Sequence, residues 1–378
     1  MKILFMTSRD ITHPEWAGGD VYHFEVSRRL AHDGNCVTML CSRYDGCRDQ
    51  EKIDGIQIIR IRGGILRALS NFLFYRKYLK RGQDIIVEEA EGPAGPLFAF
   101  LYAKEPVVIM WHQLGRTIYF NQFSYPIAVS LLVMEKIYVA LARKCQIIVP
   151  SNERAFEFIN IGFPKEKVNV VSPAFALRKD ANHGGEKTFD KPYFLILGKL
   201  RRYKAYHHAV RALKLLRDEH ENCILVIAGR RGEEKYCKEL EKLIAKCNLQ
   251  DSVIIKPNVN ENEKATLLSN ARALIVTSPI EGFSIVSVEA NSLGVPVIAT
   301  NGVPNEVIAN GFNGIKYRFG DIENLANAMS KMLHDDALRE KLSANSIESS
   351  HRFSWNSSAK TFKEVLQKVL KQTPHKQW

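Results

Sequence analysis

Short apolar runs alternate along this chain with longer segments in which apolar residues recur at helical spacing. The runs are rich in branched residues, as are strands buried on both faces of a sheet. They lie at Ile3–Met6, Cys36–Cys41, Ile56–Ile61, Asp84–Glu88, Val107–Met110, Gln146–Pro150, Tyr193–Leu197, Cys223–Ala228, Ser252–Ile255, Ala273–Thr277 and Val295–Ala299. Alternation of strands with helices is typical of parallel sheets. The pattern therefore predicts an α/β chain with doubly wound parallel sheets.

The length of the chain indicates two domains, because 378 residues are too many for one ordinary core. A polar, glycine-bearing segment, Ser172–Lys191, interrupts the series of strands and predicts a linker. We expect a Rossmann-like domain over residues 1–172 and a second one over residues 191–352.

The most informative stretch is Ala273–Asn310, which is patterned as strand, glycine-bearing turn, helix and second strand. In a parallel sheet this turn lies at the carboxyl end of a strand, where doubly wound folds bind ligands. A helix start leaves backbone N–H groups unpaired, here those of Phe283, Ser284 and Ile285. Such groups are suited to hold a phosphate.

Two glutamates flank that helix start, Glu281 in the turn and Glu289 in the helix. A carboxylate repels a phosphate but accepts hydrogen bonds from hydroxyls on either side of one. A nucleotide sugar carries such hydroxyls, on its ribose at one end and on its sugar at the other. The alternative for the pair alone is two solvated acids at a helix end.

A basic segment, Gly198–Ala205, follows the strand predicted at Tyr193–Leu197. Its cations include Lys199 and Lys204, which would neutralise a leaving diphosphate as a glycosidic bond breaks. Arg201 and Arg202 are further cations in this segment. The alternative is a solvated basic loop.

Gly18 and Gly19 precede a helix predicted over Asp20–Ala31. A glycine pair lets a ligand approach the backbone closely, although a merely flexible loop is the alternative. The segment lacks the G-x-G-x-x-G spacing, and no acidic residue stands at a convincing ribose position beyond it. These departures remove the main support for a nicotinamide dinucleotide site.

His112 directly follows the strand predicted at Val107–Met110 and one tryptophan. A side chain at the carboxyl end of a parallel strand projects toward the ligand side of the sheet. We therefore select His112 as a functional candidate of the first half, against the alternative of a structural histidine.

The chain is basic, with a formal net charge of +12 and a pI near 9.3. Nucleic acid, an anionic membrane or a phosphate-bearing substrate would each suit this charge. No nucleic-acid-binding motif accompanies it, so we expect no nucleic-acid partner. Seven scattered cysteines without a Cys-x-x-Cys pair indicate reduced thiols and a cytoplasmic setting, not a zinc site.

Two segments of the first half combine apolar with basic residues. Ile65–Arg81 is rich in leucine, aromatic and basic residues and contains no acid. Such a helix can lie in the headgroup layer of an anionic membrane, or it can pack its aromatic face on the core. Tyr125–Ala142 is strongly apolar but short for a bilayer span, which takes about 20 apolar residues. We expect it to be a buried or interfacial helix.

The stretch from Ala273 resembles the donor motif of glycosyltransferase family 4, retaining enzymes of GT-B fold. The match consists of E-G-F from Glu281, E-A from Glu289, G-V-P-V-I-A from Gly294, and Glu306. The resemblance implies two Rossmann-like domains facing across a cleft. It also implies a terminal helix, near residues 356–372, that crosses back onto the first domain.

The resemblance also implies roles for the candidate residues. Gly18 and Gly19 match a loop that faces the donor diphosphate, and His112 matches a histidine that contacts the transferred sugar. The family usually has Gly-Arg-Leu, a spacer and Lys-Gly after the first strand of the second domain. Lys199 stands in the arginine position, Lys204 matches the lysine, and Ala205 replaces the glycine. Lys199 lacks the bidentate guanidinium of an arginine, and Arg201 or Arg202 could compensate for it.

The sequence as a whole predicts a retaining hexosyltransferase that uses a nucleotide-diphosphate sugar and needs no cofactor or metal. Lysines and a helix start would do the electrostatic work of a cation. The expected acceptor is a glycan or lipid-linked precursor of the cell envelope, with the enzyme cytoplasmic and peripheral to an anionic membrane. The alternatives are an enzyme acting on a soluble sugar or sugar phosphate, a nucleotide-sugar epimerase, and a non-catalytic basic binding protein.

Overall fold

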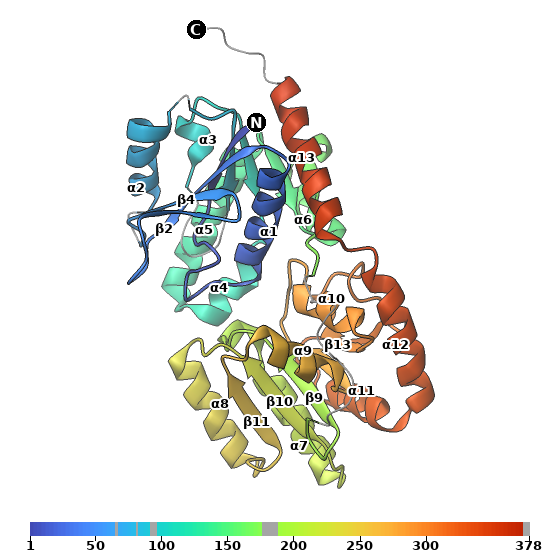
Figure 1. Ribbon diagram of the computed structural model, residues 1–378. Coiled ribbons are helices and arrows are strands. Elements are labelled where there is room, and N and C mark those ends of the chain that lie inside the picture. Colours follow the sequence, from blue (N-terminus) through green and yellow to red (C-terminus); the bar gives the residue numbers. More distant parts are fainter. Residues whose placement is uncertain (65–66, 81, 91–96, 176–187, 373–378) are drawn as a thin grey trace. The chain divides into compact units, whose positions relative to one another are not determined.

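A computed structural model describes residues 1–64, 67–80, 82–90, 97–175 and 188–372 (Figure 1). The chain forms two compact units. Unit 1 comprises Met1–Ala174 together with the chain from Ser354 onward, and unit 2 comprises Phe175–Phe353. Each unit is an α/β structure built around its own sheet.

Unit 1 contains a sheet with the strand order β3-β4-β2-β1-β5-β6-β7-β8. Every pair in it is parallel except β3 with β4. The strands are β1 (Lys2–Met6), β2 (Cys36–Ser42), β3 (Gln50–Ile53), β4 (Ile56–Ile61), β5 (Ile85–Glu89), β6 (Val107–Met110), β7 (Gln146–Val149) and β8 (Val168–Val170).

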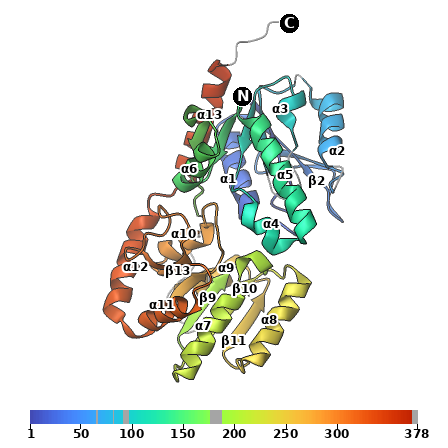
Figure 2. The same ribbon diagram turned by 180° about the vertical axis from the view of Figure 1, so that it is seen from behind.

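The helices of unit 1 cover both faces of this sheet. They are α1 (Gly18–His32), α2 (Arg67–Phe74) with the π-helical turn η1 (Tyr75–Leu79), α3 (Ala99–Tyr102), α4 (Arg116–Gln122), α5 (Tyr125–Ala142), α6 (Asn152–Asn160), η2 (Lys165–Lys167) and α13 (Trp355–Gln372). Figure 1 shows α1 and α13 side by side on one face, and Figure 2 shows α3, α5 and α6 from the other side. Phe362 of α13 stacks on Phe5 of β1 with ring centroids 5.9 Å apart, so the end of the chain completes the core of unit 1.

Unit 2 contains a parallel sheet with the strand order β11-β10-β9-β12-β13-β14. The strands are β9 (Tyr193–Leu197), β10 (Ile224–Gly229), β11 (Val253–Pro257), β12 (Ala273–Val276), β13 (Val297–Thr300) and β14 (Gly314–Tyr317). The helices are η3 (Arg202–Lys204), α7 (His207–Asp218), α8 (Glu234–Lys246), α9 (Glu261–Ser269), α10 (Ile285–Ser292), α11 (Ile322–His334) and α12 (Asp336–Ser350). Side chains of α7, α8 and α11 share one apolar core with the sheet, and those of α9 and α10 share the other.

The strand order of each unit reverses direction at one point. From β9 the chain moves to β10 on one side, and from β12 it moves to β13 on the other. In unit 1 the corresponding neighbours are β1 and β5. Doubly wound sheets bind ligands beyond the carboxyl ends of the strands at such a point. The central strands are buried on both faces, which agrees with their apolar sequences.

The structure differs from the sequence-based expectations in several elements. Helix α1 begins at Gly18, so Gly18 and Gly19 form its first turn and not a loop before it. The described part of Ile65–Arg81 is an α-helix that ends at Phe74 and continues as a π-helical turn. The short edge strand β3 was not expected, because its four residues, QEKI, show little apolar patterning. Most of the predicted linker lies outside the described residues.

Candidate functional site

An ion pair joins the two loops at the reversal point of unit 2. The Nζ atom of Lys204 lies 2.6 Å from Oε1 of Glu281. Lys204 follows β9 and Glu281 follows β12, and these two strands are hydrogen-bonded neighbours. Burial alone would lower the pKa of Lys204, but the adjoining carboxylate raises it above its ordinary value. The ammonium is therefore charged at neutral pH and partly shielded from water.

The loops around this pair are held by close backbone contacts. The hydroxyl of Thr300, at the end of β13, donates to the carbonyl of Ser278. The N–H of Glu281 donates to the carbonyl of Gly302 at 3.0 Å. A β-carbon at Gly302 would lie 2.0 Å from the carbonyl oxygen of Pro279, so only glycine allows the two loops to pack this closely. These contacts set the position of the Glu281 carboxylate.

The start of α10 presents backbone donors next to this pair. Within the described part of the chain, no protein group accepts from the N–H groups of Phe283, Ser284 and Ile285. Ser284 has φ +84°, a left-handed conformation that is costly for a residue with a side chain. Its hydroxyl lies 2.7 Å from that of Ser287 and does not cap the helix. The N–H groups are thus left available for an anion.

Glu289 lies within α10 and forms a second ion pair. Its Oε1 atom lies 2.9 Å from Nζ of Lys264 on α9, and the Glu289 side chain is buried. Burial raises the pKa of Glu289, although the ammonium of Lys264 acts in the opposite direction. The carboxylate retains acceptor capacity for a ligand hydroxyl.

Arg202, Lys199 and Ala205 of the basic segment after β9 differ in their surroundings. Arg202 forms an ion pair with Glu239 and lies over the ring of Tyr236, so it does not replace a missing guanidinium at the diphosphate position. Lys199 is half-buried where β9 ends. Ala205 adopts φ +52°, the conformation for which the glycine of the family motif is suited.

In unit 1, His112 is part of a cluster at the carboxyl ends of β5 and β6. Its Nε2 atom lies 3.3 Å from Oε1 of Glu89 and 3.2 Å from Nε2 of His23. His23, on α1, lies 2.7 Å from the same carboxylate oxygen. The other oxygen of Glu89 accepts from the N–H of Ser8 at 2.9 Å, at the end of β1. The cluster therefore lies at the reversal point of this sheet.

Glu89 is the negatively charged member of this cluster. Burial raises the pKa of a carboxyl group, but the imidazoles of His23 and His112 hold the pKa of Glu89 well below its ordinary value. The Glu89 and His23 side chains are completely enclosed, with 1% and 0% exposure, whereas the His112 side chain is 22% exposed. His112 is therefore the member that can meet a ligand.

Gly19 lies directly against this cluster. A β-carbon at Gly19 would lie 3.0 Å from Nε2 of His112. Gly18 and Gly19 thus each place a backbone N–H group in the first turn of α1. Gly19 also leaves room for the imidazole of His112. The second contribution was not expected from the sequence.

The structure brings the predicted residues together in two groups. Lys204, Glu281 and the N–H groups from Phe283 to Ile285 adjoin one another in unit 2, whereas Gly19 and His112 adjoin in unit 1. Sequence reasoning missed Lys264, Glu89 and His23. Glu89 directly follows the strand predicted at Asp84–Glu88, and that position was a usable signal; Lys264 and His23, which lie on helices, show none.

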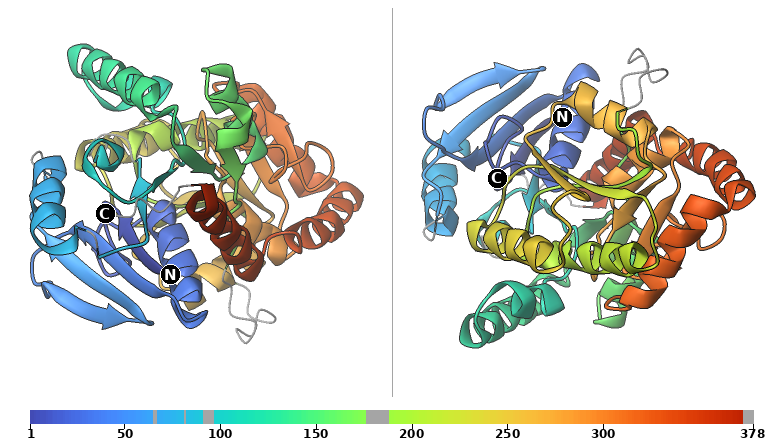
Figure 3. Two further views of the ribbon diagram at one scale, coloured as in Figure 1. Left: turned by 90° about the horizontal axis from the view of Figure 1, so that it is seen from above. Right: turned by 90° about the horizontal axis from the view of Figure 1, so that it is seen from below.

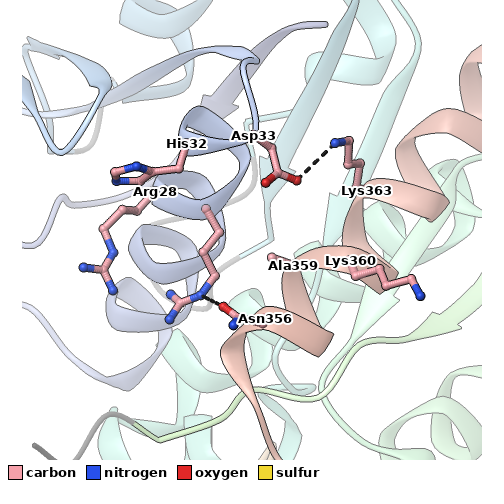
Figure 4. Close-up of a pocket in the computed structure, with 8 residues that line it drawn as sticks. Arg28, His32, Asp33, Asn356, Ala359, Lys360 and Lys363 are labelled. Carbon is pink, nitrogen blue, oxygen red and sulfur yellow. Dashed lines mark hydrogen bonds and ion pairs between the residues drawn. The ribbon is translucent and has the colours of Figure 1, made fainter.

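A separate basic hollow lies at the opposite end of α1. It has a volume of about 480 Å³ and is lined by Arg28, Arg29, His32, Asp33, Asn356, Ala359, Lys360 and Lys363 (Figure 4). Glu25 pairs with both arginines, and Asp33 lies 3.1 Å from Lys363. Because α1 begins at the carboxyl end of β1, its last turn lies far from the ligand side of the sheet. These paired charges serve the packing of α13 on α1.

Two family models together match residues 16–349 of the chain. Residues 16–179 match Glycosyltransferase Family 4, and residues 179–349 match Glycosyl transferases group 1. The D-inositol 3-phosphate glycosyltransferase of Xylanimonas cellulosilytica is 30% identical over 49% of this chain and 44% of its own length. The chain thus spans about half of that curated relative.

Solved glycosyltransferase structures share the fold over nearly the whole chain. Sucrose-phosphate synthase from Thermosynechococcus elongatus has a TM-score of 0.81 at 20% identity and covers 98% of this chain and 99% of its own. Anabaena HepE, solved in complex with UDP and glucose, has a TM-score of 0.76 at 19% identity and covers 97% and 100%. The expected GT-B fold is confirmed by this likeness.

Proposed function

Because the chain belongs to the family 4 glycosyltransferases, we propose that it transfers a hexose from a nucleoside diphosphate sugar to an acceptor hydroxyl, with retention at the anomeric carbon. One observation carries the proposal. A charged Lys204, paired with Glu281 at 2.6 Å, adjoins a helix start whose N–H groups are available. This is the pairing of cation and hydroxyl acceptor that a sugar diphosphate requires.

Donor binding uses the groups of unit 2. Lys204, Lys199 and the N–H groups from Phe283 to Ile285 hold the diphosphate, and Glu289 accepts from the ribose hydroxyls. Glu281 accepts from hydroxyls of the hexose while it keeps Lys204 charged. Gly18 and Gly19, as the first turn of α1 in unit 1, offer further N–H groups to the diphosphate.

In the transfer step, the bond between the anomeric carbon and the diphosphate oxygen breaks as the bond to the acceptor oxygen forms. The acceptor proton passes to an oxygen of the leaving diphosphate, on the face from which that group departs, so configuration is retained. Lysine ammonium groups and oriented N–H dipoles stabilise the charge that develops on the leaving group. These residues do the electrostatic work of a divalent cation, so the proposed reaction is independent of metal. His112 positions the hexose.

We take the donor to be a UDP-sugar, because HepE of the same fold was solved with UDP and with UDP-glucose. The acceptor is assigned from an exposed surface of unit 1. Among the described residues, sixteen large apolar side chains are exposed, and twelve of them lie on α2, η1, α3, α4, α5 and α6 of unit 1: Leu69, Leu73, Tyr78, Leu101, Phe120, Tyr125, Ile127, Val133, Met134, Ile137, Leu141 and Phe156. We call this set the apolar face.

Basic residues accompany the apolar face. The exposed charged residues described on α2, η1, α4 and α5, and directly after α5, are all basic: Arg76, Lys77, Arg116, Lys136, Arg143 and Lys144. Figure 3 shows α2 in light blue and α5 in teal at the outside of unit 1. Exposed apolar and cationic groups together suit an anionic lipid surface. This supports a lipid-linked acceptor and a peripheral enzyme on the cytoplasmic side.

Helix α5 has the length and composition of a membrane span, alone among the helices of the described residues, and 22% of it is buried. Ala128, Tyr138, Val139 and Ala142 pack in the core of unit 1. A helix that forms part of a core cannot also cross a bilayer. The apolar face is therefore assigned to contact with the membrane surface.

A soluble sugar phosphate is the second candidate acceptor, because the Xylanimonas relative is named for D-inositol 3-phosphate. An epimerase, which would release the sugar unattached to an acceptor, is the further alternative. Product analysis separates the epimerase from both transferases. Vesicle flotation separates the two acceptors, because only the lipid-linked one predicts salt-sensitive binding to anionic vesicles.

Thermal stabilisation by UDP, GDP, ADP, CMP and dTDP, each with magnesium and with EDTA, tests the donor site. We expect one nucleotide to raise the unfolding temperature equally under both conditions, since a ligand that binds the native state stabilises it. Glu281→Gln and Lys204→Gln should then abolish transfer while the protein remains folded. Near-normal transfer by both variants would refute the proposal.

A further inference from the structure

We propose that Glu89, supported by His23, is a positioning residue that holds His112 in the neutral tautomer with its proton on Nε2. The Nδ1 atom of His112 is then a hydrogen-bond acceptor for a hydroxyl of the bound sugar. This inference deepens the proposed function and rests on it for the identity of the ligand. The tautomer itself can be measured without any activity.

The geometry around Glu89 determines where the protons lie. Oε1 of Glu89 lies 2.7 Å from Nε2 of His23 and 3.3 Å from Nε2 of His112. An ionised carboxylate accepts hydrogen bonds and cannot donate them. Both Nε2 atoms therefore carry hydrogens that point to one oxygen, which explains why the two nitrogens approach each other to 3.2 Å.

The second nitrogen of His23 gives the charge state of that ring. Nδ1 of His23 is buried and has no hydrogen-bond partner among the described residues. A hydrogen on that atom would be a buried donor without an acceptor, which is costly. His23 is therefore neutral. It donates to Glu89 and fills the space beside it, stacked against Tyr22 with ring centroids 6.4 Å apart.

The second nitrogen of His112 lies on the exposed side of the cluster. The Nε2 edge of this ring is enclosed by Glu89, His23 and Gly19. Nδ1 makes no hydrogen bond within the described part of the protein, and the side chain is 22% exposed. With the proton fixed on Nε2, the bare lone pair of Nδ1 is directed away from the cluster and accepts from a hydroxyl.

The carboxylate itself is held on its other side. Oε2 of Glu89 accepts from the backbone N–H of Ser8 at 2.9 Å. A glutamine at position 89 could not serve both sides, because its amide nitrogen would meet either the N–H of Ser8 or the two imidazole N–H groups. Glu89→Gln is therefore an isosteric test of the arrangement.

The adjacent residue supplies a matched control. Glu88 is equally buried, but its carboxylate accepts from the N–H groups at the start of α3 and from the hydroxyl of Tyr138 at 2.8 Å. Glu88→Gln removes a buried carboxylate from the same strand without touching His112. Both variants should be checked for folding by their thermal response to UDP, whose proposed binding groups include neither Glu88 nor Glu89.

The first measurement is the histidine tautomer, by long-range ¹H–¹⁵N NMR of full-length protein labelled at histidine. Signals are assigned with His23→Gln and His112→Gln. We expect the Nε2–H tautomer for both rings in the wild type and in Glu88→Gln, and mixed tautomers for His112 in Glu89→Gln. An Nδ1–H or doubly protonated His112 at neutral pH in the wild type would overturn the inference. So would stoichiometric bound metal with both Nε2 atoms unprotonated.

The second measurement is transfer kinetics. Glu89→Gln should lower kcat by about tenfold to a hundredfold, or about 1.4–2.7 kcal/mol, because the mixed tautomers of His112 weaken its hydrogen bond to the reacting sugar. The affinity for UDP should stay within about twofold of wild type, because that binding does not use His112. Unchanged kcat in Glu89→Gln together with an altered tautomer would refute the positioning role. If the wild type transfers no sugar from any donor, the proposed function fails, and the NMR result still decides the tautomer.

Discussion

Gly19 and His112 are in such close contact that a β-carbon on the glycine would lie 3.0 Å from Nε2 of the imidazole. That distance is shorter than ordinary van der Waals contact, so any other residue at position 19 must displace the ring. The glycine belongs to the first turn of α1 and the histidine follows β6. The contact therefore couples a helix start to the residue that we assign to the sugar.

Gly19→Ala should lower kcat at least about tenfold, because a shift of a few tenths of an ångström separates His112 from Glu89 and from the sugar. Stability should change little, because alanine favours a helix over glycine by up to about 1 kcal/mol and offsets the strain. Steady-state kinetics and thermal unfolding check the two parts. A variant with full activity would show that the ring has room to move, and a marked fall in the unfolding temperature of the ligand-free variant would indicate misfolding.

Ala205 stands where the family motif has a glycine. It occupies a left-handed position with φ +52°, directly after Lys204, and is 2% exposed. Ala205→Gly relieves backbone strain of about 1 kcal/mol but loses a buried methyl group of similar value, so the free energy of unfolding should change by less than about 1 kcal/mol. UDP affinity should be retained.

Ala205→Val is the contrasting substitution. A branched side chain is a severe outlier in the left-handed region and would also overfill this site. We expect a loss of about 2 kcal/mol or more in urea unfolding and weaker UDP binding, since the turn carries Lys204. Equal stability of the glycine and valine variants would show that the backbone there is not left-handed in solution.

The strand and helix pattern of this chain was predictable because it depends on local periodicity. Each apolar run proposed from the sequence corresponds to a strand, and α9 begins with a capping box at Asn260 that its sequence displays. The elements that escaped prediction include β3, β8, β14 and the four-residue α3, which are too short to show a period. The π-helical turn at Tyr75–Leu79 has no signature in local composition.

The candidate site was predictable only where its residues are close in the sequence. Glu281 and the N–H groups of the following helix start form one short motif. The partners of Glu289 and His112 come from other elements, Lys264 from α9 and Glu89 from β5. Which side chains meet across elements depends on packing and register, and the sequence carries no local sign of either.

His207 links the stability of unit 2 to pH. Burial, and the nearby charges of His208, Arg211 and Arg202, lower the pKa of His207 from 6.5 to about 4. Between pH 6.5 and 4 the His207 imidazole is therefore protonated in the unfolded chain but neutral in the folded protein. The free energy of unfolding thus rises with pH across this window. Conversely, stability falls as the pH drops from 6.5 toward 4.

His207→Gln should flatten that part of the pH dependence. After allowance for partial exposure, the difference in unfolding free energy between pH 7 and pH 4.5 should shrink by on the order of 1–2 kcal/mol. Urea unfolding at the two values measures it, with the exposed His351→Gln as the control for losing an imidazole. An unchanged difference in His207→Gln would show that His207 does not govern the acid sensitivity.

The apolar face of unit 1 yields the prediction that separates a membrane enzyme from a soluble one. Met134 and Ile137 on α5 are 45% and 47% exposed, so replacing both with glutamate leaves the core intact. Each buried side chain of this size contributes roughly 1.5–3 kcal/mol to partition, and the new carboxylates repel anionic lipid. Flotation with phosphatidylglycerol-containing vesicles should show at least about tenfold weaker binding.

Leu215→Glu with Ile347→Glu, at exposed positions of unit 2, is the matched control and should float like the wild type. If the wild-type protein does not bind anionic vesicles, the membrane role is excluded and a soluble sugar phosphate is favoured as the acceptor.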